Sequence, residues 1–174
     1  MSNSTTFIDG TGTDKYCLCF NDTHDKDLSD VIGDKDINKI YKLTIIGGLK
    51  DKNDLLSKCI NMKQMDLEIC HPDWIKIPET LINLERLDIY SSFIDNIPNT
   101  LTKLKSLSLI CCDFIYTIPN TFINLEELTI KRCDKIKEIP ETLTNLKELC
   151  IRGCNNIIIP NNIRNIPNIK IEQI

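Results

Sequence analysis

The sequence repeats an isoleucine–proline pair at nearly constant intervals. The pair occurs at residues 77–78, 97–98, 118–119, 139–140 and 159–160, in steps of 20, 21, 21 and 20 residues. The first four pairs begin a shared frame, as in IPNTLTKLKSLSL, with apolar residues three, six, nine and eleven positions after the proline. A unit this short cannot bury its apolar side alone, so it must stack on its neighbours. The repeat therefore predicts a solenoid.

Within each unit, apolar and polar side chains alternate over a short segment, as in a β-strand. In LEELTIK, residues 125–131, Leu128 and Ile130 alternate with Glu127, Thr129 and Lys131. Successive side chains of a strand point to opposite faces. We therefore expect the leucines to fill the solenoid and the intervening residues to line a parallel sheet.

This frame resembles the leucine-rich repeat signature, L-x-x-L-x-L-x-x-[N/C]. The best copies begin at Leu104, Leu125 and Leu146, and others begin at Ile40, Met62, Leu84 and Ile166. The resemblance covers residues 37–174, about seven repeats. It implies an α/β solenoid, a right-handed superhelix with a parallel sheet on the concave face and mostly 3₁₀ or extended chain on the convex side.

The two ends of the repeat region carry separate expectations. Residues 1–36 are expected to form an N-terminal cap segment, in which YCLCF, residues 16–20, is an edge strand. Residues 46–61 are the segment in which a helical turn is expected. At the other end, NIKIEQI finishes in a strand without a polar capping repeat and leaves Ile171 and Ile174 at an unpaired edge. We expect self-association through this edge, or an added partner strand.

A small polar or thiol side chain occupies the ninth frame position in most units, although Gly48 stands there in the first. These residues are Cys70, Ser92, Cys112, Cys133 and Cys154. The chain leaves the strand at this position, and a weak S–H donor or a hydroxyl suits the backbone groups inside the coil. We therefore predict a structural ladder of buried side chains. Cys111 and Cys150, at positions eight and five, should instead face the concave side or its rim.

Other roles for cysteine need companion residues. A nucleophilic Cys133 needs a base, but the two histidines, His24 and His71, lie outside the strong repeats. A zinc site needs four ligands, and neither CLC at 17–19 with His24 nor CH at 70–71 lies in a paired C-x₂₋₄-C frame. We expect no enzyme activity, no cofactor and no metal.

Charge and termini limit the classes of partner. The formal net charge is -4, without the clustered basic surface that nucleic acid or anionic lipid requires. No segment approaches the roughly 20 apolar residues that span a bilayer, and MSNSTTFIDG lacks the features of a secretory signal. We expect an intracellular protein of the cytoplasm or nucleus that binds no nucleic acid and no membrane. Its nine cysteines should stay reduced.

The resemblance implies binding on the concave sheet, through frame positions two, three, five, seven and eight. At positions five and seven, the second and third repeats carry negative charge, the fifth and sixth carry positive charge, and a tyrosine and an isoleucine lie between. The predicted partner-binding residues are Asp66, Glu68, Asp88, Tyr90, Ile110, Lys131 and Arg152. A repeat surface separates charges partly by chance, so the two interface-forming apolar residues carry the prediction.

The function expected is a non-enzymatic protein–protein interaction module that binds a protein or peptide. One alternative is a substrate-recognition adaptor for a ubiquitin ligase, a role that this family often serves. Such an adaptor would need a separate partner, because residues 1–36 look too short for an F-box and no ligase domain follows. The other alternative is an enzyme of unknown chemistry, for which the sequence shows no constellation of Cys, His and acid.

Overall fold

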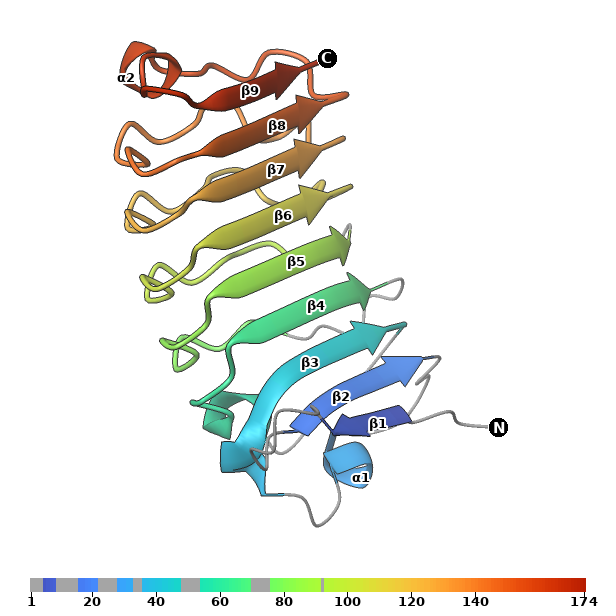
Figure 1. The fold of residues 1–174 in the computed structure, drawn as a ribbon. Coiled ribbons are helices and arrows are strands. Elements are labelled where there is room, and N and C mark those ends of the chain that lie inside the picture. The colour runs from blue at the N-terminus through green and yellow to red at the C-terminus, as the bar shows by residue number, and fades with distance from the viewer. Residues whose placement is uncertain are drawn as a thin grey trace.

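The strands of successive repeats stack into a single sheet (Figure 1). A computed structural model of the chain describes residues 5–8, 16–21, 28–32, 36–47, 54–69, 76–91 and 93–174. Within these residues, nine strands follow one another across the sheet in sequence order. They are β1 (Thr5–Ile8), β2 (Tyr16–Asn21), β3 (Ile40–Ile46), β4 (Gln64–Ile69), β5 (Arg86–Ser91), β6 (Ser106–Ile110), β7 (Glu127–Lys131), β8 (Glu148–Arg152) and β9 (Lys170–Gln173).

Every neighbouring pair from β2 to β9 is parallel. The strands β3 to β9 each fall in one unit of the sequence frame, and their register aligns the same frame position from turn to turn. Leu107, for example, pairs with Leu87 on one side and with Leu128 on the other. The prediction of a solenoid with a parallel sheet is therefore confirmed.

The N-terminal segment differs from its prediction in one respect. Residues 16–20 do form a strand, but β1 pairs antiparallel with β2 from Thr5↔Cys19 to Ile8↔Tyr16, while β3 pairs with β2 on the other side. The prediction that residues 16–20 form the edge strand is therefore wrong. The four residues of β1 carry no pattern that predicts a strand, and pairing with β2 supplies their backbone groups with hydrogen-bond partners.

The core is built from two columns of side chains on the inner face of the sheet. At most 1% of each residue is exposed. One column holds Leu43, Met65, Leu87, Leu107, Leu128 and Leu149, and the other holds Ile45, Leu67, Ile89, Leu109, Ile130 and Ile151. Burying one such side chain contributes about 1.5–3 kcal/mol, so the columns favour stacking at every turn.

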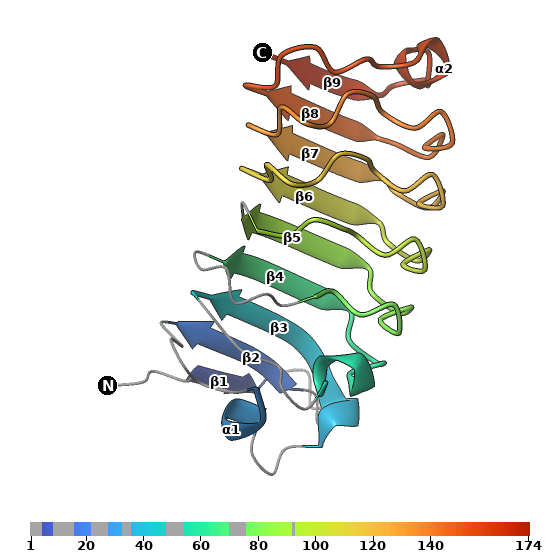
Figure 2. The same cartoon turned by 180° about the vertical axis from the view of Figure 1, so that it is seen from behind.

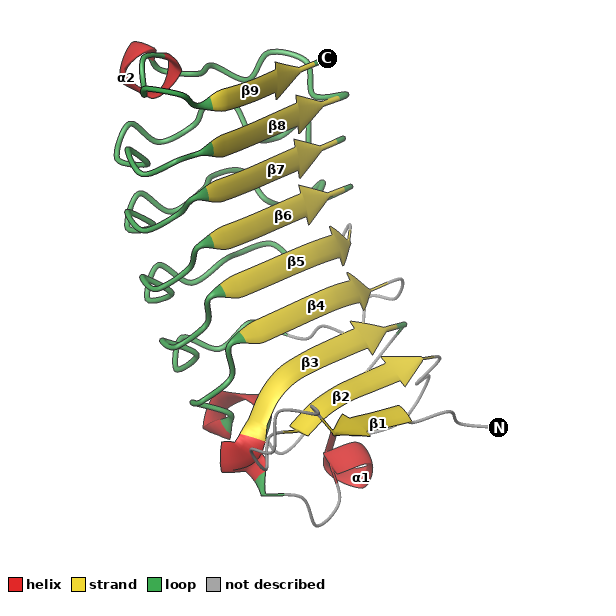
Figure 3. Ribbon diagram, in the orientation of Figure 1, coloured by secondary structure: helices red, strands yellow, loops and turns green. Residues whose placement is uncertain are grey.

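The return segments cross behind the sheet (Figure 2). Their apolar residues, including Leu101, Leu104 and Ile118, close the core from that side. From β5 to β9 these segments are mostly turns and extended chain, with one short helix, α2 (Asn161–Arg164) (Figure 3). Nearer the N-terminus lie α1 (Leu28–Ile32) and the 3₁₀ turns η1 (Ile37–Lys39) and η2 (Leu56–Lys58). The turn η2 lies inside residues 46–61, where the sequence predicts a helical turn.

Two sets of side-chain hydrogen bonds join most return segments to the one before. Threonine hydroxyls donate to carbonyl oxygens about one repeat earlier, for example Thr121 Oγ1 to Asn99 O and Thr142 Oγ1 to Asn120 O, both at 2.6 Å. Asparagine amides do the same, from Asn145 Nδ2 to Ile123 O at 2.7 Å. These bonds satisfy carbonyls that the sheet does not reach, and they help to fix the spacing of the turns.

Candidate functional site

Three aligned rows of side chains point away from the core and form what we call the outer face of the sheet. Strand alternation places them there, and the parallel register lines them up. The first row is Lys42, Gln64, Arg86, Ser106, Glu127, Glu148 and Lys170. The second row is Thr44, Asp66, Asp88, Ser108, Thr129, Cys150 and Glu172. The third row, at the ends of the strands, is Ile46, Glu68, Tyr90, Ile110, Lys131 and Arg152.

Tyr90 and Ile110 lie side by side in the middle of the third row, because they are register partners on β5 and β6. Tyr90 is 45% exposed and Ile110 is partly exposed. An aromatic and an aliphatic side chain on a mostly polar surface offer apolar area to a partner. The structure thus brings together the two residues that carried the sequence prediction.

Asp66 is bound by cationic and hydroxyl groups of its own chain. Its Oδ2 lies 2.7 Å from Lys42 Nζ and accepts a 3.0 Å hydrogen bond from Thr44 Oγ1. Its other oxygen, Oδ1, is buried and accepts no hydrogen bond within the described part of the chain. The carboxylate is therefore neutralised from one side only.

Asp88, the register partner of Asp66, is held in a similar way and is only 7% exposed. Arg86 Nε donates to Asp88 Oδ2 at 2.9 Å, and Arg86 Nη2 lies 2.8 Å from the same oxygen. Asp88 Oδ1 is buried without a partner among the described residues. Burial raises the pKa of the Asp88 carboxyl, and Asp66 raises it further, while Arg86 opposes both effects.

The predicted negative end of the outer face is thus largely compensated from within. Two cations of the first row, Lys42 and Arg86, neutralise Asp66 and Asp88, and neither cation is among the residues predicted as the site. Arg86 and Asp88 are two residues apart on one strand, so the period-two pattern could have identified them as neighbours. Glu68 is exposed and forms no ion pair with any described residue.

The predicted positive end contains one paired cation and one cation without an ion pair. Arg152 donates from Nη2 to Glu172 Oε1, and this hydrogen bond raises the pKa of Arg152. Lys131, its register partner on β7, is partly exposed and makes no ion pair among the described residues. Arg132, the next residue, is exposed at the rim where β7 ends and likewise has no ion pair there. The sequence prediction did not include Arg132.

Three ninth-position cysteines, Cys112, Cys133 and Cys154, form a continuous ladder inside the coil. Cys112 and Cys133 are 0% exposed, and Cys154 is 7% exposed. The backbone N–H of Cys112 donates to Cys133 Sγ at 3.4 Å, and that of Cys133 donates to Cys154 Sγ at 3.2 Å. Each thiol lies within hydrogen-bonding distance of strand carbonyls, as Cys133 Sγ does at 3.2 Å from Lys131 O and 3.5 Å from Leu109 O. The thiols of Cys133 and Cys154 thus supply acceptors for the backbone N–H groups that follow β6 and β7.

Hydrogen bonding within the ladder affects the acidity of its thiols. The side chain of Cys112 is the largest cause of a lowered pKa at Cys133, and burial opposes it. Burial raises the pKa of Cys154. Cys111 and Cys150 are partly exposed, unlike the ladder thiols. Cys150 Sγ lies 3.6 Å from Glu172 Oε2.

Several predicted residues lie outside the described part of the chain or at its margin. Cys70, Ser92, His24 and His71 are outside it, and so is Gly48; the backbone alone is described for Cys17 and Cys19.

Among the described residues, no three His, Cys, Asp or Glu side chains are grouped as a metal site, and no helix is long and apolar enough to cross a bilayer. At the last strand, Ile171 is partly buried and Ile174 is 80% exposed. Self-association through that edge stays a prediction.

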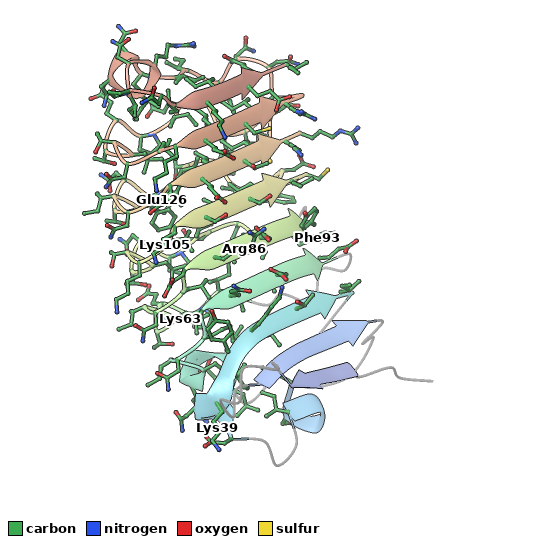
Figure 4. All side chains as sticks on the ribbon, in the orientation of Figure 1. Lys39, Lys63, Arg86, Phe93, Lys105 and Glu126 are labelled. Carbon is green, nitrogen blue, oxygen red and sulfur yellow. The ribbon has the colours of Figure 1, made fainter. Side chains whose placement is uncertain are left out.

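A column of alternating charge runs along the side where the strands begin (Figure 4). Lys63 and Lys105 bind the two oxygens of Glu85, at 2.7 and 3.0 Å, and these hydrogen bonds lower the pKa of Glu85. One turn further, Lys147 lies 2.5 Å from Glu126. These groups occupy the same frame position in successive units, so each is paired within the column.

A groove lies among the return segments and not on the outer face. This groove of about 900 Å³ is bordered by Pro98, Pro119 and Pro140 and by Tyr116, which is 59% exposed. Lysines and glutamates share its lining, so its charge is mixed. It is the natural comparison site for any test of the outer face.

No protein-family model and no curated protein matches the chain. The likeness to leucine-rich repeats therefore depends on the frame residues and on their burial and hydrogen bonding in the structure.

Proposed function

We propose that this chain is a scaffold of the leucine-rich repeat type that binds a protein or peptide partner through the outer face of its sheet, without catalysis. Burial of the frame leucines in two columns supports the repeat type. The ladder of Cys112, Cys133 and Cys154 at the ninth position supports it further, because this is the signature position of Asn or Cys.

The apolar pair Tyr90 and Ile110 is the observation that carries the binding role. The inner face of every repeat is used by the core, so stability does not require apolar groups on the outer face. A tyrosine that is 45% exposed in register with an aliphatic residue is the composition of an interface anchor. Polar rows surround the pair, which matches the arrangement of an apolar centre within a polar rim.

The test is affinity capture from extracts of the native cell with the wild-type chain and two outer-face variants, Tyr90→Ala and Ile110→Ala. Proteins captured by the wild type should fall about tenfold or more with either variant, since an anchor residue contributes about 2 kcal/mol. Tyr116→Ala is the matched control, because it removes an exposed tyrosine from the return segments. Unchanged capture by both outer-face variants, with loss in Tyr116→Ala, would contradict the proposal.

A further inference from the structure

Internal ion pairs neutralise much of the negative charge that the sequence places on the outer face. Lys42 and Arg86 already neutralise Asp66 and Asp88. A cationic partner group would have to displace one of these cations or share its carboxylate. Asp88 is also almost fully buried, so it offers little surface to a partner. The aspartates are therefore poor attachment points.

The opposite situation holds at the ends of β7 and β8. Lys131 and Arg132 make no ion pair with any described residue, and the Arg152–Glu172 pair beside them is neutral in sum. The turn carboxylates Asp113 and Asp134 form no salt bridge with these cations in the described chain. Two positive charges are thus available at this rim.

The backbone at the rim brings Arg132 toward the next turn. Arg132 and Gly153 both adopt left-handed φ angles, 52° and 61°. A Cβ added at Gly153 would lie 3.4 Å from Arg132 Cγ, so the arginine stem passes beside a residue that has no side chain. The stem of Arg132 therefore lies against the turn that follows β8, and Arg132 directly follows Lys131 in the chain.

The register places these cations next to the apolar pair. Tyr90, Ile110 and Lys131 are successive register partners on β5, β6 and β7. Neighbouring strands are about 4.8 Å apart, so Tyr90 and Lys131 are separated by roughly 10 Å. About three residues of extended chain cover that distance at roughly 3.3 Å each.

We propose that the partner is an acidic peptide segment that runs across the strand ends, placing an apolar side chain on Tyr90 and Ile110 and a carboxylate on Lys131 and Arg132. This inference rests on the proposed function and specifies its partner. The carboxylate follows or precedes the apolar residue by about three positions. Arginine can bind it with two parallel N–H···O bonds, and lysine adds a point charge.

The experiment is selection of a random displayed peptide library on the folded wild-type chain. Synthetic, fluorescently labelled copies of the enriched peptides are then titrated against variants. Enriched peptides should combine an apolar residue with Asp or Glu about three positions away. The double variant Lys131→Glu/Arg132→Glu should bind them about tenfold or more weakly. Lys135→Glu/Lys137→Glu, an equal charge change at exposed return-segment residues, should leave affinity within about twofold.

Circular dichroism checks that each variant is folded, and Lys131→Gln/Arg132→Gln replaces the reversal if it is not. Failure to enrich any peptide, enrichment of basic or neutral peptides, or equal affinity of the wild type and the Lys131/Arg132 variant overturns the inference. If Tyr90→Ala and Ile110→Ala abolish binding while the Lys131/Arg132 variant does not, the acidic partner is wrong but the outer face stands. If only Tyr116→Ala abolishes binding, both proposals are wrong.

Discussion

Asp88 is an ion-paired carboxylate whose pKa is raised by burial. One of its oxygens is bound by Arg86, while the other is buried without a hydrogen bond from any described residue. A buried polar atom without a partner destabilises the folded state, and protonation relieves part of that cost. Asp66 on the next strand adds like-charge repulsion. Asp66 Oδ1 and Asp88 Oδ1 are buried side-chain oxygens without a hydrogen-bond partner in the described part of the chain.

The raised pKa of Asp88 should be visible in how the free energy of unfolding changes with pH. Because burial raises the pKa of folded Asp88 above its usual 3.8, the folded protein binds this proton at a higher pH than the unfolded chain. The contribution of Asp88 to the free energy of unfolding therefore falls as pH rises between these two pKa values. In Asp88→Asn that decline should be absent, so the difference from wild type should grow with pH across the window and then level off.

Urea unfolding at a series of pH values measures the effect. Asp95→Asn, at an exposed residue, controls for the loss of one negative charge. A difference between Asp88→Asn and wild type that stays constant through the acidic range would contradict the assignment.

Cysteine accessibility gives a second prediction at this scale. Cys133 is 0% exposed, whereas Cys111 and Cys150 are partly exposed. Burial limits the access of reagents, so Cys111 and Cys150 should react with iodoacetamide well before Cys133. Mass spectrometry of the peptides after brief labelling measures the order, and labelling in denaturant is the control. Equal rates for Cys133 and Cys150 in the folded protein would count against the burial of the ladder.

At the scale of the repeat element, the strand and the ninth-position side chain act together. The strand ends where the chain turns inward, and the thiol of the next turn accepts the first N–H that the sheet does not pair. Each turn therefore depends on the following one for both core contact and hydrogen bonding. Position nine tolerates cysteine because a small weak donor and acceptor meets both needs.

Replacing the central ladder residue tests this dependence. Cys133→Ala leaves the Cys112 N–H without its acceptor and creates a small cavity, so it should lower the free energy of unfolding by about 2 kcal/mol. Cys133→Ser keeps a donor and an acceptor and should lose less. Urea unfolding measures both. Cys150→Ala is the control at a partly exposed thiol, and a loss there as large as in Cys133→Ala would argue against a special role for the ladder.

At the scale of the whole molecule, stability is expected to be a sum over neighbouring turns. The sheet follows chain order throughout the described residues, so each repeat strand packs chiefly on the strands before and after it. Such an arrangement transmits a defect to adjacent turns more strongly than to distant ones.

Pairs of mild core substitutions should show this decay. Ile130→Val and Ile151→Val are at register partners, whereas Ile45 lies at the other end of the column. Each change should cost about 1 kcal/mol. The adjacent pair should deviate from additivity by about 0.5 kcal/mol or more, and the pair Ile45→Val with Ile151→Val should add within about 0.5 kcal/mol. Equal coupling energies for both pairs, measured by urea unfolding, would contradict the expected decay of coupling along the core.

Much of this molecule follows from its sequence because a repeat reduces the folding problem to one turn. The spacing of the Ile-Pro pairs determined the stacking, and period-two alternation determined which side chains enter the core, from Leu43 to Leu149. The place of Tyr90 and Ile110 on the outer face followed from the same alternation. The sequence did not predict β1, because a four-residue strand takes its stability from pairing with β2.

The tertiary structure alone decided which charges are available to a partner. The sequence predicts that Asp66 and Asp88 form an exposed negative end, but Lys42 and Arg86 form ion pairs with them. Lys131 and Arg132 form no ion pair with a carboxylate among the described residues. A side chain on a parallel sheet has neighbours along its own strand and on two others, and reach and burial select among them. Frame position fixes the face on which a charge lies. Alternation already puts Arg86 and Asp88 side by side on one strand, but pairs between strands, such as Lys42 with Asp66, depend on atomic distances that only the stacked turns define.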